Sequence, residues 1–136
     1  MGDFEIYAAP LDGVVDVVWH LQLANDVAVA LAASGAVKID DNYQVRTDSA
    51  IVTVMMLPPG GEWVWPVFES HSLLVDVRFR REVVEWSDAE GLARYVFRQL
   101  RVTTKYELLL VCDVEGYVDS NFEFPERSSM IKRRPS

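Results

Sequence analysis

The sequence predicts an α+β fold: a mixed or mainly antiparallel sheet of about five to seven strands, with two or three helices packed on one face. Short runs of alternating or continuous apolar residues recur along the chain, as is typical of strands. Only two long segments keep the apolar spacing of a helix. Because strands and helices do not alternate one for one, the order argues against a doubly wound α/β fold.

The predicted strands differ in the spacing of their apolar residues. In 72–80 apolar and polar residues alternate, which predicts one buried face, whereas 105–112 is almost continuously apolar and should be buried on both faces. Pro66 restricts another segment to an edge or a short strand. Asp48-Ser49 and Pro58-Pro59-Gly60-Gly61 mark connections between strands. The predicted strands are residues 3–9, 43–47, 50–57, 62–68, 72–80, 105–112 and 117–124.

The first predicted helix covers 12–34, with Asp12 as its N-terminal cap and Gly35 as its stop. The valines near its start are β-branched and disfavour a helix, and Asn25-Asp26 could divide it, so one helix or two both remain open. The second helix begins at the capping box Ser87-Asp88-Ala89-Glu90. Its apolar stripe faces away from three arginines, which are Arg94, Arg98 and Arg101.

The 136 residues fit one domain, predicted over 1–125, followed by a flexible basic tail over 126–136. Half of the residues are hydrophobic and 25% are charged, as in ordinary globular proteins. The acidic N-terminus does not have the pattern of a secretory signal, and the longest apolar run, 27–33, is too short to span a membrane. The single cysteine, Cys112, excludes an internal disulfide. We therefore expect a cytoplasmic protein that does not bind a membrane.

The net charge of −8 is unevenly distributed along the chain. Residues 1–77 contain eleven acidic and two basic residues, and residues 106–126 contain six acidic residues and no basic one. Between them, residues 78–105 contain seven basic and four acidic residues, which we expect to pair with one another. Phosphate backbones would repel most of this chain, so nucleic-acid binding is not expected. A basic partner would be attracted over long distances, although acidity also serves solubility.

The spacing of the reactive residue types does not match a catalytic or metal-binding motif. His20 and His71 are far apart in the chain and lack the spacing of paired ligands. Ser70 and His71 are adjacent, but neighbours on an extended chain point to opposite faces, so we do not expect them to act together. Cys112 ends an apolar strand and is expected to pack in the core. The acidic turn 113–119 lacks the twelfth-position Glu of a calcium loop.

These observations predict a protein that is not an enzyme, uses no cofactor or metal, and acts by surface recognition. Trp63 and Trp65 share one face of a predicted strand, with glutamates on both sides. Aromatic residues among acidic ones are typical of interface anchors, and core packing is the alternative role of these tryptophans. The candidate partner-binding residues are Asp40, Asp41, Asp48, Glu62, Trp63, Trp65, Glu69, Asp113, Glu115 and Asp119.

Segments across most of the chain resemble the small immunity proteins that are paired with Sit swarming-inhibition toxins. The similar features are the N-terminal strand Phe4-Glu5-Ile6-Tyr7, the Val-rich strand ending in Arg78-Phe79-Arg80, the amphipathic helix over 92–100, and the apolar strand with an acidic turn over 108–113. The resemblance implies a cytoplasmic protein of bacterial competition that binds and blocks a cognate toxin without turnover. Electrostatic complementarity then predicts a basic cleft on that toxin.

Two other functions remain open from the sequence. The chain could be a small ligand-binding protein or enzyme with a pocket between sheet and helices, for which His20, His71 and the acidic turn residues are the candidates. It could also be a structural subunit of a larger complex, which would explain the acidity and the basic tail equally well.

Overall fold

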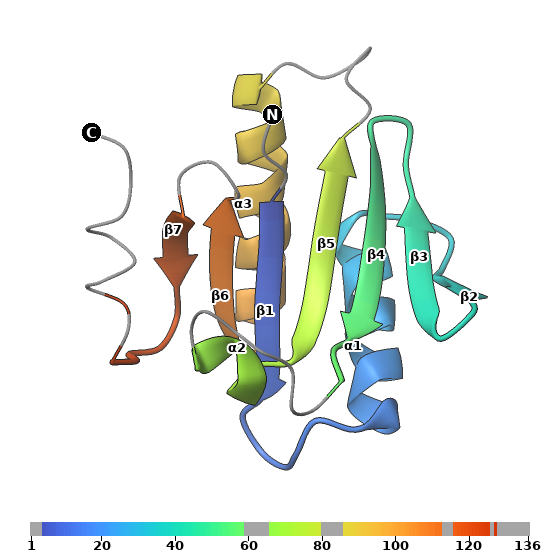
Figure 1. The fold of residues 1–136 in the computed structure, drawn as a ribbon. Coiled ribbons are helices and arrows are strands. Elements are labelled where there is room, and N and C mark those ends of the chain that lie inside the picture. Colours follow the sequence, from blue (N-terminus) through green and yellow to red (C-terminus); the bar gives the residue numbers. More distant parts are fainter. Residues whose placement is uncertain (1–3, 59–65, 80–85, 113–115, 126, 128–136) are drawn as a thin grey trace.

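The computed structural model describes residues 4–58, 66–79, 86–112, 116–125 and 127, with only the backbone of residues 86 and 87. The strands form one seven-stranded antiparallel sheet in the order β2-β3-β4-β5-β1-β6-β7 (Figure 1). The predicted α+β class is confirmed. The strands are β1 (Phe4–Pro10), β2 (Val37–Ile39), β3 (Asn42–Arg46), β4 (Ala50–Met56), β5 (Leu73–Phe79), β6 (Tyr106–Cys112) and β7 (Gly116–Ser120).

Strand β1 lies in the middle of the sheet, between β5 and β6, and is antiparallel to both. In this register Ile6 lies opposite Val75 of β5 and Leu110 of β6. All three side chains are fully buried in the main core. Cross-strand apolar rows of this kind are the unit from which a sheet gains stability, and they fix the register of the central strands.

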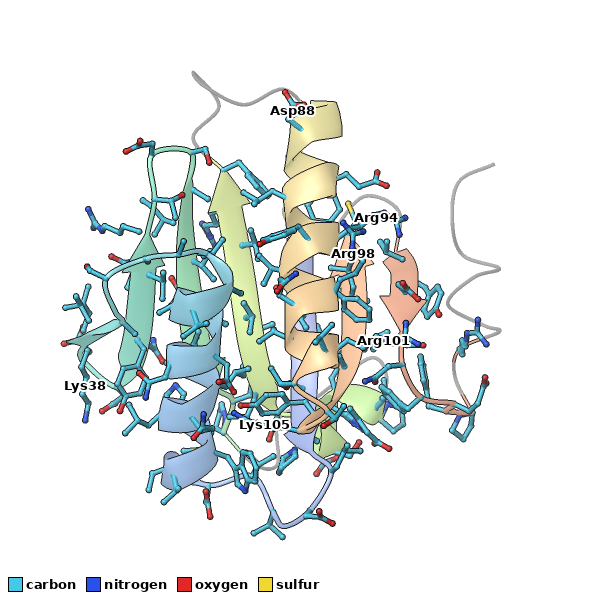
Figure 2. The ribbon with its side chains drawn as sticks, turned by 180° about the vertical axis from the view of Figure 1, so that it is seen from behind. Lys38, Asp88, Arg94, Arg98, Arg101 and Lys105 are labelled. Atoms are coloured by element: carbon cyan, nitrogen blue, oxygen red, sulfur yellow. The ribbon has the colours of Figure 1, made fainter. Side chains whose placement is uncertain are left out.

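Helices α1 (Val17–Ala30) and α3 (Trp86–Val102) cover one face of the sheet. In the view from behind, both helices lie in front of the strands (Figure 2). Helix α3 buries Ala93, Val96 and Leu100 above β1 and β6, which confirms its predicted apolar stripe. Helix α1 buries Leu23 and Val27 and packs on β3 and β4. The main core therefore lies between this helix layer and the sheet.

The opposite face of the sheet is covered by a short helix, α2 (Val67–Ser70), and by the segment 121–125. Tyr7 of β1 and Phe68 of α2 stack there, with their ring centroids 4.1 Å apart. Leu109 of β6 is buried in this second cluster, whereas its neighbour Leu108 is buried in the main core. The predicted burial of this strand on both faces is therefore confirmed.

Helix α1 is one continuous helix, so the alternative of two helices is wrong. Its N-terminal cap is Asp16, whose carboxylate accepts a hydrogen bond from the Trp19 backbone amide at 2.9 Å. The predicted cap, Asp12, lies outside the helix and is exposed. At the other end the chain turns at Ala32, which has a φ of 53°, and not at Gly35. The helix is therefore shorter at both ends than predicted.

Three other elements differ from the predicted ones. Strand β7 ends at Ser120, so residues 121–124 of the predicted strand 117–124 are not part of it. Strand β2 forms in a stretch expected to be a polar turn, and its three residues are all exposed. Helix α2 replaces the end of the predicted strand 62–68, because Pro66 has helical backbone angles and starts a helical turn. Residues 62–65 of that predicted strand lie outside the described residues.

Helix α3 begins at Trp86, one residue before the predicted cap Ser87. The side-chain contacts of Ser87 lie outside the described residues, as does the predicted tail except for Arg127. Within the described part of the chain, the helices are too short or too polar to cross a membrane.

Candidate functional site

Three of the predicted partner-binding aspartates lie in two separate turns. Asp40 and Asp41 form the turn between β2 and β3, where Asp40 has a φ of 55°, and Asp48 lies between β3 and β4. All three are exposed. Because β3 separates the turns, they are about 17 Å apart along the strand. The hairpin therefore does not bring Asp48 to the other two.

The other described candidates lie elsewhere. Glu69 is exposed on α2, and Asp119 is half-buried on β7, at the sheet edge opposite to β2. Asp119 accepts a hydrogen bond from the Ser120 amide at 2.8 Å. The partner-binding role of all of these residues stays a prediction. The candidates that lie outside the described residues are Glu62, Trp63, Trp65, Asp113 and Glu115.

The outer face of α1 is apolar and exposed. A helix that covers a sheet normally presents charged and polar residues to water. Five residues of α1 are exposed, and apart from Asn25 they are all large apolar residues. Val18 is 71% exposed and Val29 is 78% exposed. No charged residue of α1, which is described in full, belongs to this exposed set. We define the outer face of α1 as Val17, Val18, Leu21 and Val29.

A pocket of about 330 Å³ connects the first turn of α1 to the β2–β3 hairpin. His20 is buried beside it, and its Nε2 donates a hydrogen bond to the Val54 carbonyl oxygen at 2.8 Å. This bond gives His20 a structural role, because it connects α1 to β4. The pocket also places Asp41 close to the outer face of α1. Its lining residues are Val17, His20, Lys38, Asp41, Tyr43 and Met56.

Strand β2 adds an open sheet edge next to this pocket. Among the described strands it pairs only with β3, so one side of its backbone has no neighbouring strand. Val37 and Ile39 are exposed on it. Because they alternate with Lys38, they lie on the other face of the strand from the pocket. Open strand edges of this kind can accept a further strand.

The inner side of α1 is anchored by a polar cluster around Asp26. Its carboxylate accepts hydrogen bonds from the Tyr106 hydroxyl at 2.7 Å and from the Lys105 ammonium group at 3.2 Å. Burial raises the pKa of the Tyr106 hydroxyl, and the hydrogen bond to Asp26 and its negative charge raise it further. The cluster connects α1 to the start of β6 and so holds α1 in position on the sheet.

The arginines of α3 follow the helix on the side toward β6 and β7 (Figure 2). Arg94 pairs with Glu90 at 2.9 Å, as the prediction of internal pairing requires. Arg98 and Arg101 are exposed, and neither forms an ion pair with another residue that the structure describes. In the described part of α3, internal pairing therefore holds for Arg94 alone.

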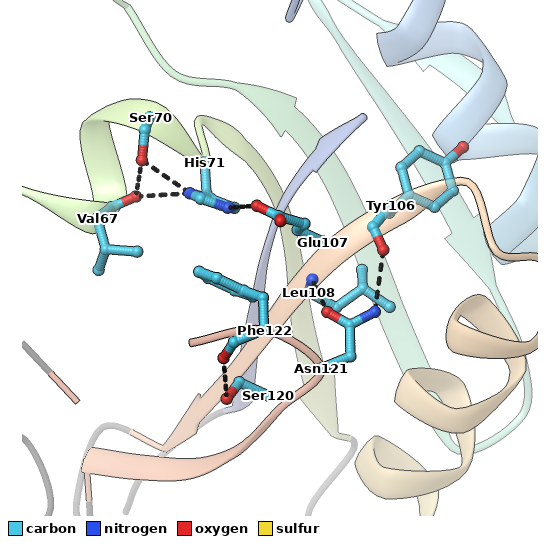
Figure 3. A network of polar contacts seen from close by, with 9 residues as sticks. All are labelled: Val67, Ser70, His71, Tyr106, Glu107, Leu108, Ser120, Asn121 and Phe122. Atoms are coloured by element: carbon cyan, nitrogen blue, oxygen red, sulfur yellow. Dashed lines mark hydrogen bonds and ion pairs between the residues drawn. The ribbon is translucent and has the colours of Figure 1, made fainter. Parts of the chain in front are cut away.

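Ser70 and His71 lie together, so the expectation that they point apart is wrong. His71 is the C-terminal cap of α2, and its ψ of 64° is not that of an extended strand. The Ser70 hydroxyl lies 2.8 Å from His71 Nδ1, and His71 Nε2 lies 3.0 Å from the Glu107 carboxylate of β6 (Figure 3). Phe122 stacks on the imidazole with a centroid distance of 4.4 Å. No pattern in the sequence indicated Glu107, which β6 brings to His71.

Cys112 is buried in the main core, as predicted. The described residues contain no group of three or more His, Cys, Asp or Glu side chains that could hold a metal ion. No protein-family model matches the chain, and no significant match is found to a curated protein or a solved structure. Its function must therefore be inferred from its own residues and from the resemblance described above.

Proposed function

We propose that the chain is an immunity protein that binds a cognate protein toxin through the outer face of α1 and the adjoining Asp40-Asp41 turn. The observation that carries the proposal is the uncharged, exposed face of α1. Val17, Val18 and Val29 are each about 70% exposed or more. Asn25 is the one polar residue exposed among them. Groups of large apolar side chains on an exposed surface are typical of interaction sites, because their exposure to water is unfavourable.

The low helix propensity of valine indicates that these valines do not serve to stabilise the helix. Valine is a poor helix former, because its β-branched side chain loses rotamer freedom against the preceding turn. Val17 and Val18 occupy the first turn of α1, where they contribute little to the core because they point to water. Their presence therefore gains nothing for the isolated fold, and contact with a partner would explain it.

The acidic residues near the outer face of α1 indicate which kind of partner would bind there. Asp12, Asp16, Asp40 and Asp41 are exposed at the N-terminal end of α1 and at the β2–β3 turn. Lys38 is the only basic residue among the residues that line the adjoining pocket. An apolar centre with an acidic border suits a partner whose apolar contact surface is bordered by lysine or arginine. A toxin with a basic cleft, the partner that the resemblance implies, has this chemistry.

The proposal places the protein in the cytoplasm, where it would occupy the toxin without turnover. The test is to express the gene next to this one, if it encodes a toxin-like C-terminal domain, with and without this chain. We expect the chain to restore growth and to form a complex that survives gel filtration. A neighbouring metabolic gene, together with failure of any adjacent product to bind, would contradict the proposal.

A further inference from the structure

The Ser70–His71–Glu107 contacts form a chain of hydrogen bonds, and the Val67 carbonyl oxygen lies beside its first two members (Figure 3). An ionised carboxylate only accepts, so His71 Nε2 must carry the hydrogen that faces Glu107. In the neutral imidazole Nδ1 is then an acceptor, and the Ser70 hydroxyl can donate to it at 2.8 Å or to the Val67 carbonyl oxygen at 3.1 Å. In the first of these two directions the serine hydrogen points at the histidine, while the carboxylate holds the ring from the other side.

The same surroundings can hold a second proton on His71. The Val67 carbonyl oxygen lies 3.2 Å from Nδ1, so it can accept a hydrogen bond once Nδ1 is protonated. Glu107 would then neutralise the imidazolium at 3.0 Å. His71 is 7% exposed, whereas Ser70 is exposed to solvent. The site thus combines an accessible hydroxyl with a sheltered imidazole that faces a carboxylate.

An open pocket of about 380 Å³ adjoins Ser70, with apolar walls on both sides. Val67 and Pro66 of the α2 segment form one wall, and Phe122, Phe124 and Pro125 form the other. A space of this size and character accepts a small acyl or aryl group. Glu107 and Glu123 lie at its border and disfavour an anionic substrate.

We propose that Ser70 is a nucleophile toward small, uncharged carboxylic esters, with His71 as its general base and Glu107 as a positioning residue. Ser70 Oγ bonds to the carbonyl carbon as its proton passes to His71 Nδ1. The ester C–O bond then breaks, and the leaving alcohol takes that proton. Water, deprotonated by His71, attacks the acyl-serine, which releases the carboxylic acid and restores Ser70. This activity is separate from binding at α1.

The expected rate is modest for a structural reason. A positioned base contributes about 10²–10⁴-fold, whereas the loss of one oxyanion donor removes about 10²–10³-fold. Apart from Ser70 and His71, the side chains that line the described pocket have no hydrogen-bond donor for a developing oxyanion. The site therefore suits activated esters with good leaving groups.

The test is hydrolysis of p-nitrophenyl acetate, together with labelling by a fluorophosphonate probe and peptide mass spectrometry. We expect the label on Ser70 and at least about a tenfold loss of kcat/KM in Ser70→Ala. Ser72→Ala is the matched control, because Ser72 adjoins His71 on the other side, and it should keep the wild-type rate. Equal rates in Ser70→Ala and wild type, or a label on another residue, would overturn the proposal.

Glu107→Gln tests the positioning role. It should lower kcat and leave KM nearly unchanged, because the pocket walls stay while the ring loses its orienting carboxylate. Glu107→Asp should restore part of the lost kcat. An unchanged kcat in Glu107→Gln would remove Glu107 from the mechanism. The activity of His71→Gln tests the general base only if circular dichroism shows a native fold. If this variant does not fold, Ser70→Ala, at an exposed position, tests the proposal.

Discussion

At the scale of single residues, the Asp26 cluster shows how a polar group is accommodated beneath a helix. Asp26 is largely shielded, with its side chain 12% exposed, and it is bonded by Tyr106, Lys105 and Gln22. A shielded carboxylate that loses a donor keeps the full penalty of desolvation. The Tyr106 hydroxyl should therefore matter more to stability than a surface hydrogen bond does.

Tyr106→Phe removes this hydroxyl and little else. We expect the free energy of unfolding to fall by about 1.5–3 kcal/mol, the range for a hydrogen bond to a charged group. Urea denaturation followed by circular dichroism measures it. Tyr95→Phe is the matched control, since Tyr95 is an exposed tyrosine of α3 and should give no change. Equal stability of the two variants would show that Asp26 does not need Tyr106.

The raised pKa of Tyr106 predicts a pH dependence with a definite sign. A tyrosine whose pKa is higher in the folded state binds its proton more tightly there than in the unfolded chain. Its contribution is complete below the unfolded pKa of about 10 and is lost as pH rises beyond it. The wild type should therefore lose more stability than Tyr106→Phe between about pH 9 and pH 11. Parallel losses in denaturant titrations would contradict this.

Contacts between single residues at the Ser70–His71–Glu107 site were the features least predictable from the sequence. Cys112 in the core followed from its place in an apolar strand. The contact between Ser70 and His71 did not, because it depends on α2, whose single turn leaves no helical periodicity to detect. Glu107 reaches His71 only through the packing of α2 on β6. Such a pairing between distant segments leaves no pattern in one sequence.

At the scale of elements, α1 begins with residues that disfavour a helix and has a specific N-terminal cap. Its first two residues are valines, so the Asp16 carboxylate at the Trp19 amide is important for where the helix begins. Asp16→Ala should lower the free energy of unfolding by about 1 kcal/mol. Asp12→Ala, at the position that the sequence favours as the cap, should have almost no effect in the same denaturation experiment. The reverse order would show that the helix begins earlier.

The outer face of α1 predicts an unusual outcome for surface substitution. Val18→Lys with Val29→Lys replaces two exposed, helix-averse residues by better helix formers. We expect the midpoint of thermal unfolding to stay the same or to rise slightly. A clear fall in this midpoint would mean that the valines serve the isolated fold, and the argument for a partner would lose its basis.

Strands and helices were predictable to different extents. The alternation in β5 and the continuous run in β6 indicated both strands, because the sheet period of two is visible over seven residues. The burial of β6 on both faces was indicated as well, whereas the single buried face predicted for β5 was wrong, since Leu74 and Asp76 on its other face are also buried. Strand β2 is only three residues long, so its alternation of Val37, Lys38 and Ile39 is too short to predict a strand. The ends of α1 were misplaced because Asp12 and Asp16 are equally suitable caps by type, and the first lies after Pro10 in an irregular stretch.

At the scale of the whole molecule, charge should act on the rate of association with a basic partner. Asp40→Lys with Asp41→Lys should lower the association rate constant with the toxin and make its salt dependence less steep. Asp48→Lys, at the far end of β3, should have a smaller effect. Stopped-flow or surface-plasmon measurements at several salt concentrations distinguish these outcomes. Equal effects at both turns would indicate that only net charge matters.

The acidic α+β composition could be predicted from the sequence, and two of the predicted candidates, Asp40 and Asp41, form the turn that adjoins the proposed binding surface. The valines of α1 could not be singled out from the sequence, because apolar residues in a helix are normally assigned to the core. Only the packing of α1 on β3 and β4 shows which of its faces is buried. The exposed apolar face of α1 can therefore be recognised only when the packing of the folded molecule is known.

The central claim is that the outer face of α1 binds the partner, and isothermal titration calorimetry with the purified toxin domain tests it most directly. The double substitution Val18→Lys and Val29→Lys should raise Kd by about 100-fold, which corresponds to the loss of two contacts of just over 1 kcal/mol each. Val102→Lys, at an equally exposed valine of α3, should bind like the wild type. A double variant that is folded and binds with the wild-type Kd would contradict the account.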